Sequence, residues 1–203
     1  MQKFGLLLLF FIPIISCSQK PESTTYTQQI RKHRYELNVK FADKETTPLT
    51  EKDFKEFSTL KFFPIDSTYH ITAKFELNEN PILFEMPTTT DRKPIYKTYG
   101  VASFELKGET YELQIYQNQE LILDPEYKNH LFIPFVDKTN GNESYGGGRY
   151  LDLEQPEDDT IILDFNRAYN PYCAYSDRYS CPIPPIENHL NVAINAGVKA
   201  YKH

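Results

Sequence analysis

Residues 95–117, IYKTYGVASFELKGETYELQIYQ, carry the clearest structural signal in the chain. In the second half of this stretch, Tyr111, Leu113 and Ile115 alternate with polar residues, which is the pattern of a strand with one buried face. Lys107–Gly108 separates the two halves and suits a two-residue hairpin turn. The stretch therefore predicts two antiparallel strands joined by a tight turn.

The same signals continue on both sides of this hairpin. Tyr69–Leu77 alternates between apolar and polar residues and predicts another half-buried strand. Turn residues such as Asp124-Pro125 separate the candidate strands from one another. The further candidate strands are 82–86, 120–123, 131–136, 150–153 and 160–165. Short strands with turns between them predict a mainly antiparallel β sandwich or barrel.

Two short helices are expected before the strands. Gln28–Ala42 has apolar residues at partly helical spacing. Thr50 is a good N-cap for a second helix, because Glu51 and Asp53 then fall in its first turn and suit the helix dipole. The predicted fold class is therefore α+β, with short N-terminal helices and a β-rich remainder.

The first 17 residues, MQKFGLLLLFFIPIISC, have the layout of an export signal. Lys3 precedes the apolar run Phe4–Ile15, which is too short to cross a bilayer, since a spanning helix needs about 20 residues. The run ends in Ile14-Ile15-Ser16-Cys17, which resembles a bacterial lipobox. We predict that residues 1–16 are a lipoprotein signal peptide and that Cys17 is lipidated. Residues 17–27 then form a flexible tether, and 28–203 form a single β-rich domain.

The expected location is the cell envelope. Ser18 after the cysteine resembles the sorting signal for the outer membrane, so we expect a lipid anchor on its periplasmic face. An ordinary signal peptide with an unmodified Cys17, or a short membrane anchor, are the alternatives. The chain has 22 Lys and Arg against 28 Asp and Glu. Since nucleic-acid binding needs clustered cations, no nucleic-acid partner is expected.

Segment 145–188 concentrates residue types that form binding sites. Tyrosine combines an apolar body with a polar tip, and arginine forks bind carboxylates or phosphates. The ligand-binding candidates are Tyr145, Arg149, Tyr150, Asp164, Asn166, Arg167, Tyr169, Asn170, Tyr175, Glu187 and Asn188. Each also has a plain structural interpretation. The glycines before Arg149 fit a bulged strand entry better than an anion cradle, and Arg149 or Arg167 can pair with Asp164. His70 and His130 are interpreted as structural.

Two cysteines lie inside this segment. Once Cys17 carries lipid, Cys173 and Cys181 are an even pair in an oxidising compartment, which favours a disulfide. Free structural thiols, or a nucleophilic or metal-binding role with His189, are the alternatives. The spacing matches no common zinc motif, so no metal is predicted.

Three stretches resemble a known family. They are LKFFPIDSTYHITAKFE at 60–76, FIPFVDKTNGNESYGGGRYLDL at 132–153 and LDFNRAYNPYCAYSDRYSCPIPPIEN at 163–188. Together they are similar to the bacterial domain-of-unknown-function family numbered 1684. The resemblance implies no activity and no catalytic residues. It does imply that 145–188 is the shared core of a site.

The predicted function is a lipid-anchored binding module for a small molecule or an envelope component. One alternative is a hydrolase or lyase that acts on an envelope substrate. In that case Asp164, Glu187 and His189 are the acid–base candidates, and Arg149 or Arg167 stabilises negative charge. The other alternative is a purely structural lipoprotein. No catalytic residue is assigned, and no cofactor is predicted.

Overall fold

The computed structural model describes residues 25–201. The predicted signal peptide 1–16, the lipidation site Cys17 and most of the predicted tether lie outside the described residues. The first helix, α1 (Tyr26–Ala42), begins two residues before the predicted start at Gln28, so the last two residues of the predicted tether belong to it. Thr25 caps it and forms a capping box with Gln28.

Seven strands form one sheet in which every pair is antiparallel. They are β1 (His70–Leu77), β2 (Leu83–Glu85), β3 (Ile95–Leu106), β4 (Glu109–Asn118), β5 (His130–Phe135), β6 (Arg149–Glu154) and β7 (Thr160–Asp164). The strand order is β6-β5-β4-β3-β1-β7, and β2 pairs with β3. The mainly antiparallel β class predicted from the sequence is therefore confirmed.

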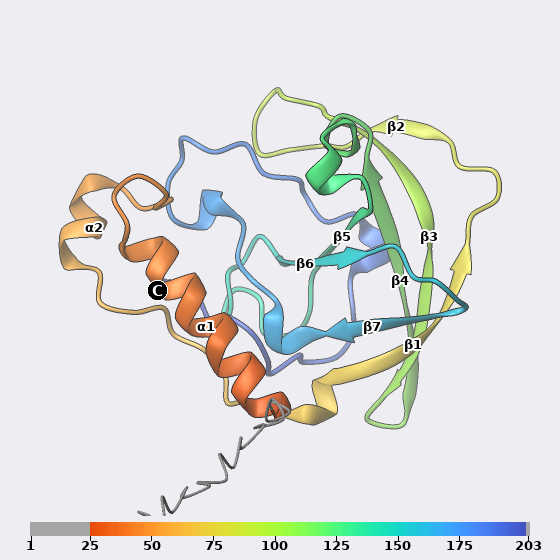
Figure 1. The fold of residues 1–203 in the computed structure, drawn as a ribbon, viewed down its shortest axis with the longest axis horizontal. Helices are drawn as coiled ribbons and strands as arrows, with labels where there is room; N and C mark the ends of the chain where they lie inside the picture. Colours follow the sequence, from red (N-terminus) through yellow and green to blue (C-terminus); the bar gives the residue numbers. More distant parts are fainter. Residues whose placement is uncertain (1–24, 202–203) are drawn as a thin grey trace, which may run out of the picture.

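The sheet curls into a half-barrel, as Figure 1 shows. Its two edges approach each other where Tyr150 of β6 meets Tyr169, which follows β7. The Tyr150 backbone N–H donates to the Tyr169 carbonyl at 2.9 Å, and the Tyr169 backbone N–H donates to the Tyr150 carbonyl at 3.1 Å. This bridge satisfies backbone groups that an open edge would leave exposed.

The β3–β4 hairpin forms where the alternation predicts it. Lys107 and Gly108 have positive φ values of 55° and 84°, as a two-residue turn between twisted strands requires. The expected strand at 120–123 is wrong, because Leu121–Leu123 forms a single 3₁₀ turn. Asn118 Oδ1 accepts hydrogen bonds from the N–H groups of Glu120 and Leu121, each at 2.9 Å, and so holds the turn.

The main core lies on the inner face of the half-barrel, where the C-terminal segment packs against the sheet (Figure 1). The buried contributors include Leu113, Ile115, Leu131 and Ile133 from the sheet and Leu190, Val192, Ile194 and Ala196 from the C-terminal segment. The extended C-terminal chain therefore supplies the apolar surface that a second sheet supplies in a sandwich.

The second helix, α2 (Glu51–Glu56), is capped by Thr50, whose side chain accepts from the Asp53 N–H. Phe41 at the end of α1 packs with Leu49, Leu60 and Tyr175 in a separate apolar cluster. Figure 1 shows both helices on the side of the molecule away from β3 and β4. Within residues 25–201, none of the helices has the length and apolar character needed to cross a membrane.

Candidate functional site

A cavity of about 520 Å³ lies between α1, strands β5 and β6, and the segment 169–182. Its walls are rich in tyrosine, contributed by Tyr96, Tyr127, Tyr150, Tyr169, Tyr172, Tyr175 and Tyr179. The exposed side chains of Lys40 and Arg92 also line it. A largely apolar cavity of this size with a few convergent polar groups is the usual form of a small-molecule site.

Strands β5 and β6 build one wall of the cavity with the face opposite to the main core. His130 and Phe132 alternate along β5 with the core residues, and Phe132 pairs in register with Asp152 of β6. Tyr150 lies two residues before Asp152, so it points to the same side of the sheet. The Phe132 and Tyr150 rings meet edge to face, with their centroids 4.8 Å apart.

A chain of hydrogen bonds crosses this wall. Asp152 Oδ1 accepts from the Tyr169 hydroxyl at 2.9 Å and lies 3.1 Å from His130 Nε2. Burial, followed by the Asp152 charge, raises the pKa of Tyr169 well above its ordinary value, so this hydroxyl stays a donor. His130 Nδ1 is buried without a hydrogen-bond partner among the described residues.

Asn170 is a second residue of the cavity wall with an unsatisfied atom. Its side chain is 1% exposed, and its Nδ2 donates to the Lys199 carbonyl at 2.9 Å and to the Tyr175 hydroxyl at 3.3 Å. Its Oδ1 has no partner among residues 25–201. This oxygen exposes less than 1 Å² to solvent, so it lies behind the cavity surface, and Asn170 lines the cavity through its other atoms.

Tyr150, Tyr169, Asn170 and Tyr175 are the sequence-predicted candidates that line this cavity. They come from β6 and from the segment that crosses over it. The remaining seven candidates lie elsewhere, in a buried network, a cluster at the start of α1, a second hollow and the surroundings of the cysteines.

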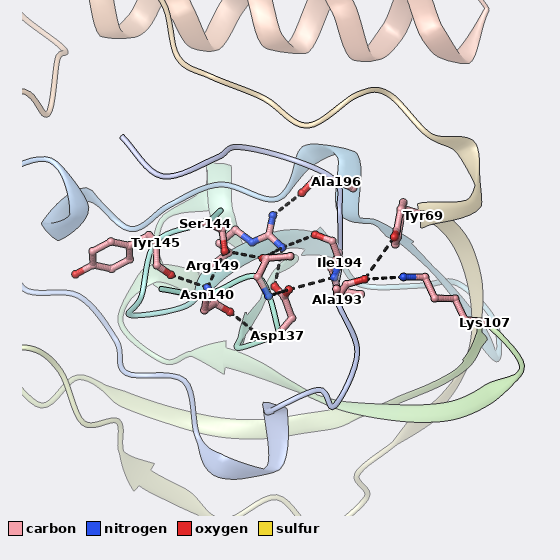
Figure 2. A network of polar contacts seen from close by, with 11 residues as sticks. Tyr69, Lys107, Asp137, Asn140, Ser144, Tyr145, Arg149, Ala193, Ile194 and Ala196 are labelled. Atoms are coloured by element: carbon pink, nitrogen blue, oxygen red, sulfur yellow. Dashed lines mark hydrogen bonds and ion pairs between the residues drawn. The ribbon is translucent and has the colours of Figure 1, made fainter. Parts of the chain in front are cut away.

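Arg149 does not line the cavity. Figure 2 shows its bonds to Asp137, Ile194 and Ala196. Its side chain is fully buried and its Nη2 lies 2.6 Å from Asp137 Oδ2. The guanidinium also donates to the carbonyl oxygens of Ile194, at 2.8 Å, and of Ala196. The expected ligand contact is therefore corrected: Arg149 ties the C-terminal segment to the loop after β5. The suggested Asp164 is not its partner.

Asp164, Asn166 and Arg167 form a cluster with Tyr26 of α1. Asp164 accepts from the Tyr26 hydroxyl at 2.8 Å and from Arg167 Nε at 3.1 Å. Asn166 Nδ2 donates to the Tyr26 oxygen at 2.8 Å. The cluster holds α1 against the end of β7. These residues therefore have a structural role here, as the expected Arg167–Asp164 pair suggests.

Asn188 is buried, and its side chain makes hydrogen bonds to backbone groups of β4 and β5. It accepts from the Gln114 N–H at 2.7 Å, and its Nδ2 donates to the carbonyls of Gln114 at 3.0 Å and Pro134 at 2.8 Å. Between β4 and β5 the Cα pairing is confined to Tyr116 and Phe132, and proline has no N–H to offer. Asn188 thus satisfies backbone groups that the two strands leave open, and it is not free to bind a ligand.

Glu187 lines a second, smaller hollow of about 400 Å³ with Tyr116 and Pro184. Since Asp164 lies in the Tyr26 cluster, Asp164 and Glu187 do not share a cavity. The His189 ring lies 3.3 Å from the Pro184 carbonyl. The acid–base arrangement expected for a hydrolase or lyase is therefore not assembled from these residues.

Cys173 and Cys181 lie side by side, and Cys181 lines the large cavity. Both are free thiols here, and the Cys173 N–H lies 3.1 Å from Cys181 Sγ. The Tyr145 hydroxyl is 3.9 Å from Cys173 Sγ. Hydrogen bonding from the Cys181 thiol, partly opposed by burial, lowers the pKa of Cys173 to about 7. Their pairing in a disulfide stays a prediction.

Sequence reasoning missed several residues of the cavity. His130 was interpreted as structural, and Asp152, Tyr96, Lys40 and Arg92 were not considered, yet all five line the cavity. His130 directly precedes a predicted strand and Asp152 lies in one, so the two-residue period of a strand is the signal that groups His130 with Phe132 and Asp152 with Tyr150. In the part of the chain that the structure describes, no three His, Cys, Asp or Glu side chains are grouped to hold a metal.

Comparison with known proteins gives a family and no activity. A search of curated proteins finds no match. The chain is similar to an uncharacterized protein from gene locus rrnAC0354 of Haloarcula marismortui, known from a solution NMR structure, with 35% sequence identity and a TM-score of 0.68. That alignment covers 88% of this chain and 96% of the other. Residues 55–199 match the model of the family described as "Protein of unknown function (DUF1684)". The family expected from the three motifs is confirmed, and the chain belongs to DUF1684.

Proposed function

We propose that this protein is a lipid-anchored binding module of the cell envelope that holds a small molecule in the tyrosine-lined cavity. The observation that carries the proposal is the cavity itself, which has a volume of about 520 Å³ and a wall rich in tyrosine. The tyrosine faces favour a ligand with a flat apolar body.

The lipid anchor is supported by the sequence of residues 1–17 and by no structural observation. Replacing Cys17→Ala should leave a soluble or uncleaved form of the protein in cell fractions. If Cys17→Ala fractionates with membranes as the wild type does, and shows the same processing, the anchor is excluded.

Binding in the cavity is tested with naphthalene-2-carboxamide, a flat neutral compound with an N–H donor. Leu37 is half-buried on α1 and lines the cavity, so Leu37→Trp fills part of it. Val39 on the same helix is 49% exposed and does not line the cavity, so Val39→Trp is the matched control. Calorimetry on the full chain in detergent, with a detergent-only blank, measures the dissociation constant.

We expect saturable one-site binding to the wild type and to Val39→Trp, and weakened binding to Leu37→Trp. Because the chain has no tryptophan, Leu37→Trp also carries a single fluorophore in the cavity wall, whose emission reports any probe that still binds there. Equal binding to the two variants would place the probe elsewhere. Absence of saturable binding by this probe and by its charged analogues, described below, would remove the proposed function.

A further inference from the structure

The charges on the cavity wall are unevenly paired. Lys40 of α1 and Arg92, in the segment between β2 and β3, both line the cavity. Neither forms an ion pair with a carboxylate within residues 25–201. The Lys40 ammonium lies over the Tyr172 ring, 5.3 Å from its centroid.

The single carboxylate in the wall is already engaged. Asp152 Oδ1 receives the hydrogen bond of Tyr169 and faces His130 Nε2. His33 adds no charge near neutral pH, because burial and then the nearby Arg167 lower its pKa. The wall therefore carries two unpaired cations against one occupied carboxylate, in a chain that has more acidic than basic residues.

An anion in the cavity would give Lys40 and Arg92 the partner that they lack. A guanidinium and an ammonium both bind carboxylates through charge-assisted hydrogen bonds, and the tyrosine walls reduce competition from water. The rings of Tyr172 and Tyr179 lie 5.1 Å apart, beside the part of the wall that Lys40 contacts. Aromatic faces at this position favour a flat ring next to the charged group.

We infer that the ligand of this cavity is a planar ring compound that carries a carboxylate, with the ring against the tyrosines and the carboxylate against Lys40 and Arg92. This inference rests on the proposed function and names the chemical class of its ligand. A cationic ligand is the opposite choice, since tyrosine faces also attract cations. The two unpaired cations oppose it, because they repel a positively charged group entering the same cavity.

The test compares three probes that share one ring: naphthalene-2-carboxylate, naphthalene-2-carboxamide and naphthalen-2-yl-trimethylammonium. The carboxylate and the carboxamide have nearly the same shape and differ in charge. Exposed charge pairs are individually weak, so we expect the carboxylate to bind about fivefold more tightly than the carboxamide at low salt. The cation should bind most weakly, and added salt should reduce the preference for the carboxylate.

Lys40→Met and Arg92→Met remove each charge and keep an unbranched side chain. Each variant should lower the affinity for the carboxylate by about twofold to threefold, as expected for a single exposed pair. Affinity for the carboxamide should stay as in the wild type, which shows that the cavity is intact. Lys93→Met is the matched control, because Lys93 is adjacent to Arg92 but pairs with Glu85 at 3.3 Å.

The possible outcomes separate the two proposals. If no probe binds, the proposed function fails. If the carboxamide binds in the cavity but the carboxylate binds no more tightly, or the cation binds best, the inference about the anion is overturned alone. It is also overturned if Lys40→Met and Arg92→Met weaken both probes equally, or if Lys93→Met has the same effect as they do.

Discussion

The buried Arg149–Asp137 pair gives the strongest prediction about stability. Both side chains are fully buried and their charged atoms lie 2.6 Å apart. Arg149→Met keeps a similar unbranched shape but leaves the Asp137 carboxylate without a counter-charge. Removing one partner of a buried ion pair typically costs about 3–5 kcal/mol. The carbonyls of Ile194 and Ala196 also lose their donor.

Asp137 keeps some compensation, which places the expected loss near the lower end of that range. Its Oδ1 accepts from the N–H groups of Thr139 at 2.9 Å and Ile194 at 3.1 Å. We expect a loss of about 3 kcal/mol in the free energy of unfolding, which at about 2 kcal/mol per molar urea lowers the midpoint by about 1.5 M. Urea titration followed by circular dichroism measures it.

Two further variants identify the cause of that loss. Asp137→Asn combined with Arg149→Met removes the unpaired Asp137 carboxylate. The double variant should therefore be more stable than the sum of the two single losses predicts. Arg167→Met is the matched control, because Arg167 is 45% exposed in its pair with Asp164 and should cost about 1 kcal/mol or less. A loss for Arg149→Met no larger than that for Arg167→Met would refute the reasoning. Naphthalene-2-carboxamide should still bind to folded Arg149→Met.

Three other predictions concern the same motif region. Gly148 has φ of 93°, and an added Cβ would lie 2.6 Å from Pro184 Cγ and 2.7 Å from the Phe135 oxygen. Gly148→Ala should therefore cost about 2 kcal/mol or more in urea titrations, whereas Gly146→Ala, with its nearest neighbour at 3.6 Å, should cost little. The pKa of Cys173 is about 7, so its alkylation by iodoacetamide should be slow below that pH and fast above it. Tyr145→Phe removes the hydroxyl beside Cys173 Sγ and should raise the pH midpoint of alkylation. A wild-type midpoint near 8.5, the ordinary pKa of a thiol, would contradict the hydrogen bonding at Cys173. Oxidised glutathione should convert the two thiols to a disulfide by exchange, releasing two reduced glutathione molecules and lowering the mass of the protein by about 2 Da.

The sequence predicts the strands well where alternation and turn residues agree. The β3–β4 hairpin shows both signals, and its bounds follow from them. The stretch 120–123 has an apolar run without alternation, and there the local hydrogen bonds of Asn118 produce a turn instead. A short apolar run does not distinguish a strand from a turn.

The candidate site was predicted in part, because residue type reports chemistry but not burial. Tyr150, Tyr169, Asn170 and Tyr175 line the cavity, whereas Arg149 is buried beside Asp137. Arg149 is buried because the C-terminal segment packs over it. That packing joins residues far apart in the sequence, so the residues next to Arg149 do not predict it. The same limit explains why Lys40 and Arg92, far from the motif in sequence, were missed.

The alternation of β5 and β6 explains why one motif contains both buried and cavity-lining residues. Ile133 and Leu151 face the core, and Phe132 and Asp152 face the cavity. A slip of one residue in register would exchange the two faces. Arg149 lies on the core side immediately before Tyr150, and its bonds to Asp137 and the C-terminal segment fix that register. Tyr150 is also held by its backbone bridge to Tyr169 and by the bond from its hydroxyl to the Pro182 carbonyl, so we expect the cavity to persist in folded Arg149→Met although the ion pair is lost.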